Sequence, residues 1–370
     1  MKILLYGEGH RPGTGAWCYA ETLRDMGCEV VVFADHERLE VYGRSIGFRA
    51  WLRMARKPWE FHRKQHVAQL IAVVKRERPE IVIILKGLYI GPDDIRELQA
   101  QSCWVVNINH DDFFSQNRNN WSHLQRKALH NYDYILTTRE CNVAEVRRFN
   151  ENVEFFPFAY YPRIHRPLKI PDTERAVWGV DVVFVGNYEQ ERSQLLEELV
   201  TRIRANYAIW GVQWHKVGRH SPLAPHIKGR SVVVDDMAKA IGGAKVALAF
   251  LRKENRDDYT QRTFEIPACS GVLLGERTRR HQEIYREGEE AEFFDHRSPD
   301  ELASKVRMLL NDDVHRERVR AAGRAALLRQ AYTYQDRMQR VLELFNKHHR
   351  AIRCSDENDR ERKSISNGCL

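Results

Sequence analysis

Residues 180–199 read VDVVFVGNYEQERSQLLEEL, which is an apolar strand pattern, then a glycine turn, then a helical pattern. The same order opens the chain, where KILLYGEGHRPGTG at residues 2–15 leads into a helix expected from about Ala16 to Met26. In both halves, uniformly apolar strands alternate with helices, which predicts parallel sheets covered on both faces. Because the pattern begins again near residue 180, the sequence predicts an α/β fold of two doubly wound, Rossmann-like lobes facing each other across a cleft.

The two predicted lobes are joined by a segment without clear periodicity. Residues 153–179 are rich in proline and read VEFFPFAYYPRIHRPLKIPDTERAVWG, which is typical of a linker. We expect an N-terminal lobe over residues 1–165 and a C-terminal lobe over residues 166–335. A helix over residues 336–350 is expected to pack back on the N-terminal lobe, and the polar, charged residues 351–370 are expected to form a disordered tail.

Two local sequence patterns predict a helix and a strand in the second half of the chain. Ser298 is expected to cap a helix that begins at Pro299, with Glu301 completing a capping box. The apolar run SVVV at residues 231–234 predicts a strand.

Composition narrows the class of protein and of partner. The 370 residues suit two domains, and the formal net charge of +8 favours nucleotides, phosphorylated substrates, anionic lipid or nucleic acid as partners. The seven cysteines form no C-x-x-C pair, which indicates reduced thiols in a cytosol and argues against a zinc site or a disulfide framework. No apolar run is long enough to span a membrane, and MKILLYGEGH reads as a strand and not as a signal peptide. A cytoplasmic protein is therefore expected.

The first loop, GEGHRPGTG at residues 7–15, has glycines that let a ligand approach the backbone next to a helix N-terminus. The candidate contacts are Gly9, Gly13 and Gly15. A nicotinamide dinucleotide site is an alternative, with Asp35 as the ribose acid, but Pro12 replaces the third glycine of the G-x-G-x-x-G pattern. A simple tight turn is the other alternative.

A second candidate group follows the apolar strand that ends in NINHDDFFSQN, residues 107–117. His110, Asp111 and Asp112 emerge at the carboxyl end of this strand, where an imidazole or a carboxylate could remove a proton from an acceptor hydroxyl. Alternatively, the two aspartates cap the next segment and the histidine packs. Two adjacent carboxylates without further ligand spacing do not predict a metal site.

The second lobe carries the candidates for nucleotide binding. Gly186 permits the turn after its first strand, and Arg192 precedes a helix that Ser193 is expected to cap, a place that suits a bidentate contact with a pyrophosphate. An exposed arginine without a ligand is the alternative.

The densest cluster is FLRKENRDDYTQRTFEIPACSG at residues 250–271, whose basic residues are Arg252, Lys253, Arg256 and Arg262. Thr263 is expected to cap a short helix and to place Glu265 in its first turn. Glu265 then either interacts favourably with the helix dipole or accepts hydrogen bonds from two ribose hydroxyls. The basic residues beside it favour the ribose contact.

This stretch resembles a known family. The pattern R-D-x-x-T-x-R-T-F-E-I-P-A-C-x-G at residues 256–271, with LL-x-E-R-T and E-G-x-E-A-E-F-F after it, is similar to the C-terminal lobe of the CgeB-like glycosyltransferases, which have the GT-B fold. Looser similarity in the first half covers NHDD, TTRECNVAEVRRF and FFPFAYYPRIHRP, so that the resemblance spans nearly the whole chain except the tail.

The resemblance implies a nucleotide-diphosphate sugar as donor and no obligatory cofactor or metal. It implies that Glu265 grips the ribose, that Asp257 stands in place of a longer acid near the donor sugar, and that Arg192 and Arg262 contact the diphosphate. The shorter acid leaves the identity of the sugar open.

The sequence therefore predicts a cytosolic glycosyltransferase that binds its donor in the second lobe and its acceptor in the first, and then closes the cleft. The sequence does not distinguish between a cell-surface glycan, a lipid-linked molecule and a protein as the acceptor. The alternatives are a sugar-nucleotide epimerase of the same fold and a non-catalytic assembly protein that binds a nucleotide sugar. Nucleic acid is not an expected partner, because the basic residues form no recognised module. Residues 49–66, RAWLRMARKPWEFHRKQH, could contact an anionic membrane peripherally.

Overall fold

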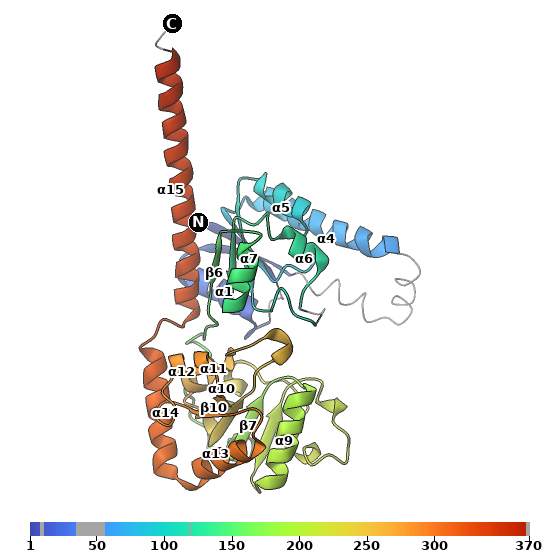
Figure 1. The fold of residues 1–370 in the computed structure, drawn as a ribbon, viewed down its shortest axis with the longest axis vertical. Helices are drawn as coiled ribbons and strands as arrows, with labels where there is room; N and C mark the ends of the chain where they lie inside the picture. The colour runs from blue at the N-terminus through green and yellow to red at the C-terminus, as the bar shows by residue number, and fades with distance from the viewer. Residues whose placement is uncertain (8–10, 35–55, 118–119, 368–370) are drawn as a thin grey trace.

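The computed structural model describes residues 1–7, 11–34, 56–117 and 120–367, and shows two lobes, each built on a parallel sheet (Figure 1). The N-terminal sheet has six parallel strands in the order β2-β1-β3-β4-β5-β6. Its strands are β1 (Lys2–Gly7), β2 (Glu29–Ala34), β3 (Ile81–Leu85), β4 (Trp104–Asn109), β5 (Tyr134–Thr137) and β6 (Val153–Phe155).

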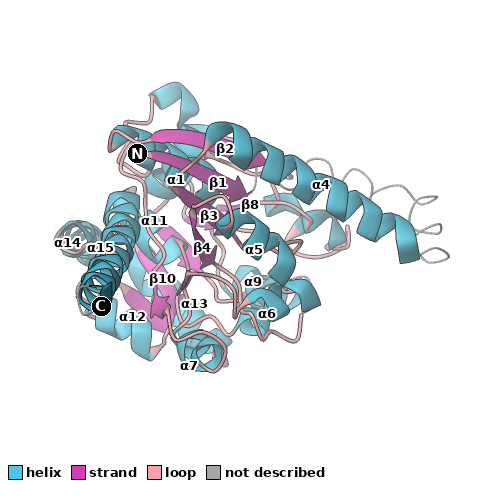
Figure 2. Cartoon of the chain, turned by 90° about the horizontal axis from the view of Figure 1, so that it is seen from above, coloured by secondary structure: helices cyan, strands magenta, loops and turns pink. Residues whose placement is uncertain are grey.

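Helices cover both faces of this sheet (Figure 2). Alternate residues of β1 point to opposite faces, so Ile3 and Leu5 join the core under one group of helices while Leu4 and Tyr6 join the core under the other. The helices are α1 (Gly15–Asp25), α4 (Arg56–Glu77), α5 (Pro92–Gln99), α6 (His123–Ala128) and α7 (Glu140–Arg147).

The C-terminal sheet has five parallel strands in the order β11-β10-β9-β7-β8. Its strands are β7 (Val182–Val185), β8 (Tyr207–Trp210), β9 (Val246–Ala249), β10 (Leu273–Glu276) and β11 (Glu292–Phe294). The α-helices around it are α8 (Arg175–Trp178), α9 (Gln190–Arg202), α10 (Val234–Gly243), α11 (Arg262–Ala268), α12 (Arg279–Ile284), α13 (Pro299–Asn311) and α14 (Asp313–Leu328). Short 3-10 turns are η1 (Asp172–Glu174), η2 (Trp214–Lys216), η3 (Ala224–His226) and η4 (Lys253–Asn255). As expected, Ser298 caps α13, because its hydroxyl accepts a hydrogen bond from the Glu301 N–H at 3.2 Å.

The last helix, α15 (Tyr334–Asn367), returns the chain to the N-terminal lobe and extends beyond it (Figure 1). Met338, Val341 and Phe345 are buried in the same core cluster as Leu23 of α1. The helical backbone continues through residues 351–367, where the composition predicted disorder. No proline or glycine interrupts that stretch, so the chain contains no residue that would stop the helix.

The prediction of a strand at residues 231–234 is wrong. Residues 231–233 have no regular structure, and Val234 begins α10. Strand β8 is the edge of the C-terminal sheet, and beyond it Ile209 makes only an isolated bridge with Ile227. Within the run, Val232 is buried in the core whereas Val233 is 51% exposed, so the apolar run predicted neither a strand nor uniform burial.

Candidate active site between the lobes

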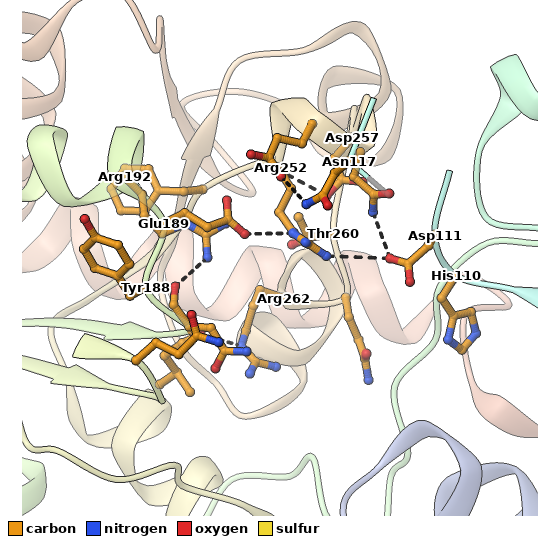
Figure 3. A pocket seen from close by; sticks show the side chains of 18 of the residues that line it. His110, Asp111, Asn117, Tyr188, Glu189, Arg192, Arg252, Asp257, Thr260 and Arg262 are labelled. Carbon is orange, nitrogen blue, oxygen red and sulfur yellow. Dashed lines mark hydrogen bonds and ion pairs between the residues drawn. The ribbon is translucent and has the colours of Figure 1, made fainter. Parts of the chain in front are cut away.

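A pocket of about 700 Å³ lies where the carboxyl ends of the two sheets face each other, which is where ligands bind in doubly wound folds (Figure 3). Its walls come from the loops after β4, β7 and β9, from η2 and from the start of α11. Its size is in the range of small-molecule sites. Both lobes contribute lining residues, as the sequence predicted for a cleft.

Arg192 lines the pocket from the first turn of α9, not from before the helix, because α9 begins at Gln190 with Glu189 as its N-cap residue. Ser193 is therefore not the cap. The Arg192 guanidinium donates to the Asn187 carbonyl at 3.0 Å and lies 3.2 Å from a Glu189 carboxylate oxygen. Burial lowers the pKa of Arg192. Gly186 is required beside it, because a Cβ there would lie 2.6 Å from the Phe184 ring.

Arg252 crosses the pocket from one lobe to the other (Figure 3). Its Nε donates to Glu189 Oε1 at 2.8 Å, and its Nη1 lies 3.6 Å from Asp111 Oδ1 in the N-terminal lobe. Burial would lower the pKa of Arg252, but the carboxylates of Glu189, Asp111 and Asp257 outweigh it and raise the pKa. Arg252 is thus a fixed cation between the two lobes.

Arg262 is the first residue of α11, and its side chain lines the pocket. Its Nε donates to the Val185 carbonyl at 3.0 Å, and its Nη1 forms an ion pair with Glu265. Burial lowers the pKa of Arg262 to about 10. Together with Arg192 and Arg252, it gives the C-terminal lobe three guanidinium groups that line the pocket.

Thr263 and Glu265 lie differently from the expectation. The N-cap residue of α11 is Gln261, and Thr263 is a fully buried helix residue whose hydroxyl bonds the Thr260 N–H at 3.1 Å and His281 Nε2 at 2.8 Å. Glu265 is 2% exposed, and neither it nor Thr263 lines the pocket. A helix of this pitch turns successive side chains to different sides, so Arg262 reaches the cavity, as do Thr260 and Gln261 before the helix, whereas Thr263 and Glu265 do not.

His110 and Asp111 line the pocket from the N-terminal lobe. His110 Nε2 lies 2.9 Å from the Tyr19 hydroxyl, and burial lowers the pKa of His110 to about 4, so the ring is neutral near pH 7. Asp111 pairs with Lys86 Nζ at 2.7 Å. Burial alone would raise the pKa of Asp111, but Lys86 and neighbouring arginines outweigh it and lower the pKa. Asp111 is therefore ionised.

Asp112 does not belong to the pocket. It is fully buried, and Arg256 of the C-terminal lobe binds both of its oxygens at 2.6 and 2.7 Å, while Asn142 Nδ2 donates to it at 2.8 Å. Arg256 also contacts Glu145 at 2.8 Å. We call these residues, with Asn255, the seam: Asp112, Asn142, Glu145, Asn255 and Arg256. Asp112 therefore contacts the C-terminal lobe and not this pocket, so its surroundings do not support the catalytic role expected for it.

Asp257 lies between the seam and the pocket. It lines the cavity, but Oδ1 pairs with Arg139 of the N-terminal lobe and Oδ2 accepts a hydrogen bond from the Arg252 N–H at 3.3 Å. Its side chain is 4% exposed, and burial raises its pKa against the effect of Arg139. A contact with a donor sugar would have to compete with Arg139.

The glycine loop after β1 meets the other lobe. A Cβ on Gly13, whose φ is +85°, would lie 3.4 Å from the Val233 side chain, and one on Gly15 would lie 3.5 Å from the His110 ring. Neither glycine lines the pocket. Gly9 and Asp35 lie outside the described residues. The described part of this loop therefore packs against the C-terminal lobe and against His110.

Sequence reasoning missed Arg139, which is 2% exposed and donates to the Asn255 carbonyl at 2.6 Å as well as pairing with Asp257. It also missed Tyr188, Gln213 and Lys216 in the pocket wall. Arg139 and Tyr188 each follow a strand closely, so the strand-end rule that found Asp111 could have found both. Gln213 and Lys216 follow β8, which ends at Trp210, so the same rule points to this loop as well.

Two further features are absent from the described residues. They contain no group of three or more His, Cys, Asp or Glu side chains arranged to hold a metal ion. They also contain no helix that is both long and apolar enough to cross a membrane.

Comparison with known proteins identifies the architecture. Residues 191–343 match the family described as Glycosyl transferase-like, and no curated protein matches the sequence. Among solved structures, HepE from Anabaena in complex with UDP and glucose has 11% identity and a TM-score of 0.65, over 94% of this chain and 100% of that one. Sucrose-phosphate synthase from Thermosynechococcus elongatus has 11% identity and a TM-score of 0.66, over 95% and 100%. MnaA from S. aureus with UDP has 10% identity and a TM-score of 0.57, over 92% and 95%. The chain therefore has the two-lobed GT-B fold, and much of its second lobe matches a glycosyl transferase-like domain.

Proposed function

We propose that this chain transfers a sugar from a nucleoside diphosphate sugar to an acceptor. The observation that carries the proposal is the convergence of Arg192, Arg252 and Arg262 on one pocket between the lobes, opposite His110 and Asp111. The glycosyl transferase-like match over residues 191–343 supports it. So do the complexes of HepE with UDP and UDP-glucose and of MnaA with UDP, which have the same architecture.

In this proposal, the three arginines hold the diphosphate and stabilise the charge that develops on it as the bond to the sugar breaks. Fixed cations in a pocket need no reorganisation during the reaction, which is why they stabilise a leaving group effectively. The arginines are themselves held by carbonyl and carboxylate oxygens, as with Arg262 on Val185 and Arg252 on Glu189. We propose that this arrangement works without a metal ion or another cofactor, so that transfer continues in the presence of a chelator.

On the acceptor side, a neutral His110 can take the proton of an acceptor hydroxyl. Ionised Asp111, held by Lys86, orients the acceptor or stabilises positive charge at the reacting carbon. The donor is proposed to be a UDP-sugar. The proposed acceptor is a cell-surface glycan, a lipid-linked molecule or a protein. The resemblance of residues 256–271 to the CgeB-like glycosyltransferases supports membership of that family as part of the proposal.

The reaction is proposed to take place in the cytoplasm, with peripheral contact to an anionic membrane through residues 49–66. Residues 49–55 lie outside the described residues. Phe61 on α4 is 59% exposed and supports such a contact, whereas Arg63 is buried and paired with Asp94 at 2.6 Å. The described part of this segment therefore offers fewer side chains for membrane contact than the sequence suggested.

Nucleotide binding followed by product analysis tests the proposed function. Thermal melting is measured with UDP, GDP, ADP, CDP and dTDP and with their glucose derivatives, because a ligand that binds only the folded state raises the melting temperature. The proposal expects at least one diphosphate to raise it and the matching sugar donor to be hydrolysed slowly without an acceptor. No rise with any of these compounds would overturn it. Conversion of the sugar to its epimer would instead identify an epimerase, and tight binding without turnover of any donor would identify a non-catalytic binding protein.

A further inference from the structure

Glu265 lies directly behind the wall of the pocket. Its side chain is 3% exposed and does not line the cavity, whereas Gln261, the N-cap residue of α11, and Arg262, its first residue, do. Both of these residues contact the Glu265 carboxylate: Gln261 Nε2 donates to Oε1 at 2.7 Å, and Arg262 Nη1 pairs with Oε2. The carboxylate thus connects two lining side chains from behind.

The third neighbour of Glu265 contributes no charge. His165 Nδ1 accepts a hydrogen bond from the Tyr161 N–H at 2.8 Å, so the neutral ring carries its hydrogen on Nε2, which lies 3.2 Å from Glu265 Oε1. Burial lowers the pKa of His165 to about 3. Among the described residues, Arg262 is therefore the cation that neutralises this buried carboxylate.

The Arg262 guanidinium is fixed at two of its three nitrogens. Nε donates to the Val185 carbonyl at 3.0 Å and Nη1 pairs with Glu265, whereas no bond of Nη2 is seen in the described part of the chain. A planar guanidinium that is held at two nitrogens presents the third in a fixed direction. The open Nη2 is the atom left for a ligand in the pocket.

We propose that Glu265 is a positioning residue: it holds Arg262, and with it Gln261, for the diphosphate and does not touch the nucleotide. This inference rests on the proposed function, because it assigns Arg262 to the diphosphate. It differs from the ribose contact expected from the sequence, since both oxygens of Glu265 already have partners on the protein. Because the side chain is buried and each oxygen has a protein partner, protein groups and not ribose hydroxyls are the neighbours of this carboxylate.

A double-mutant cycle tests the coupling. UDP binding is measured by calorimetry for wild type, Glu265→Gln, Arg262→Gln and the double variant. Each single change is expected to weaken binding by about tenfold, because each removes or misplaces one charge-assisted contact. If Glu265 acts through Arg262, the double variant binds UDP no more than about twofold more weakly than Arg262→Gln alone. Independent, multiplicative losses would overturn the proposal.

The ligand itself supplies the second test. The proposal expects Glu265→Gln to weaken UDP, 2′-deoxy-UDP and 3′-deoxy-UDP by the same factor, because the lost contact is to the diphosphate. If the effect of the substitution disappears with either deoxy compound, Glu265 touches the ribose and the inference is wrong. If Glu265→Gln binds UDP as wild type does, the inference is also wrong.

Two controls separate the possible failures. Glu292→Gln removes another buried, paired carboxylate of the same lobe, held by Lys305 at 2.5 Å and His315 at 2.8 Å, and should leave UDP binding unchanged. If it weakens UDP binding as Glu265→Gln does, the effect reflects general loss of stability and contradicts the proposal. Wild type that binds none of the nucleoside diphosphates overturns the proposed function itself, whereas wild-type binding with a multiplicative cycle overturns only the role of Glu265.

Discussion

The seam and the pocket are built from the same loop, yet they do different things. Arg252 and Arg256 lie four positions apart and are similarly exposed, at 37% and 41%. Arg256 binds Asp112, which is fully buried, whereas Arg252 lies between Glu189 and Asp111, whose side chains are 32% and 17% exposed. The burial of the partner carboxylate, more than that of the arginine, therefore separates Arg256 of the seam from Arg252, which also contacts both lobes but lines the pocket.

The largest expected effect is at the seam. Arg256→Met leaves the buried Asp112 carboxylate with Asn142 and a backbone N–H but without its cation, and should cost about 3–5 kcal/mol of folding free energy. Thermal and urea unfolding measure this loss. The control is the pair Arg256→Met with Asp112→Asn, which should recover part of the loss because no buried charge remains. A melting temperature equal to that of wild type would show that the seam does not stabilise the folded chain.

At the pocket, the expected effect is on ligand affinity. Arg252→Gln should weaken UDP binding by about 1.5–3 kcal/mol, the range of a charge-assisted contact, and should lower stability less than Arg256→Met does. Calorimetry and thermal unfolding give the two numbers. Arg307→Gln, an exposed arginine on α13 outside the pocket, is the matched control. If Arg252→Gln destabilises the fold as strongly as Arg256→Met and still binds UDP normally, Arg252 acts as a seam residue and not as a ligand-binding residue.

Behind the pocket, neutral buried histidines predict sensitivity to acid. Burial lowers the pKa of His281 to about 4, against about 6.5 for an unfolded histidine. Between these values the unfolded state binds the proton and the folded state does not, so stability is full above pH 6.5 and falls as the pH drops toward 4. The slope should be about 1.4 kcal/mol per pH unit for each such histidine.

His165 and His110, with pKa values of about 3 and about 4, add to this slope. Urea unfolding at several pH values between 7 and 5 should show a shallower slope for His281→Asn than for wild type. His130→Asn, at an exposed histidine, is the control. An identical slope in the His281 variant would mean that this ring is not kept neutral by the fold.

The smallest expected effect is at the rim of the seam. Glu145 pairs with Arg256 at 2.8 Å, but its side chain is 29% exposed. Glu145→Gln should therefore cost only about 0.2–1 kcal/mol, as for other solvent-accessible ion pairs. Thermal unfolding alongside Arg256→Met measures the ratio of the two effects. A loss as large as that of Arg256→Met would place the stability of the seam in Glu145 and not in Asp112.

The alternation of apolar strands and helices in the sequence was sufficient to predict the architecture. Uniformly apolar strands such as VVFV at residues 182–185, each followed by a turn and a helix, require a parallel sheet that is covered on both faces. The same pattern placed His110, Asp111 and Gly186 at strand ends, and all three line the pocket. This worked because the carboxyl ends of parallel strands meet at one edge of a sheet, whatever the loops contain.

The direction of each side chain within those loops was decided by the tertiary structure alone. Asp111 and Asp112 are adjacent and chemically identical, but Asp112 faces Arg256, 144 positions away in the chain, and Asp111 faces the pocket. Glu265 was expected at the ligand and lies behind Arg262, against His165 from the linker between the lobes. Helical and strand periodicities constrain neighbours within a few residues, whereas the partner of a buried charge is fixed by how the two lobes dock. The local sequence therefore determined where the charged side chains would gather, and only the docked lobes determined which of them stayed open to a ligand.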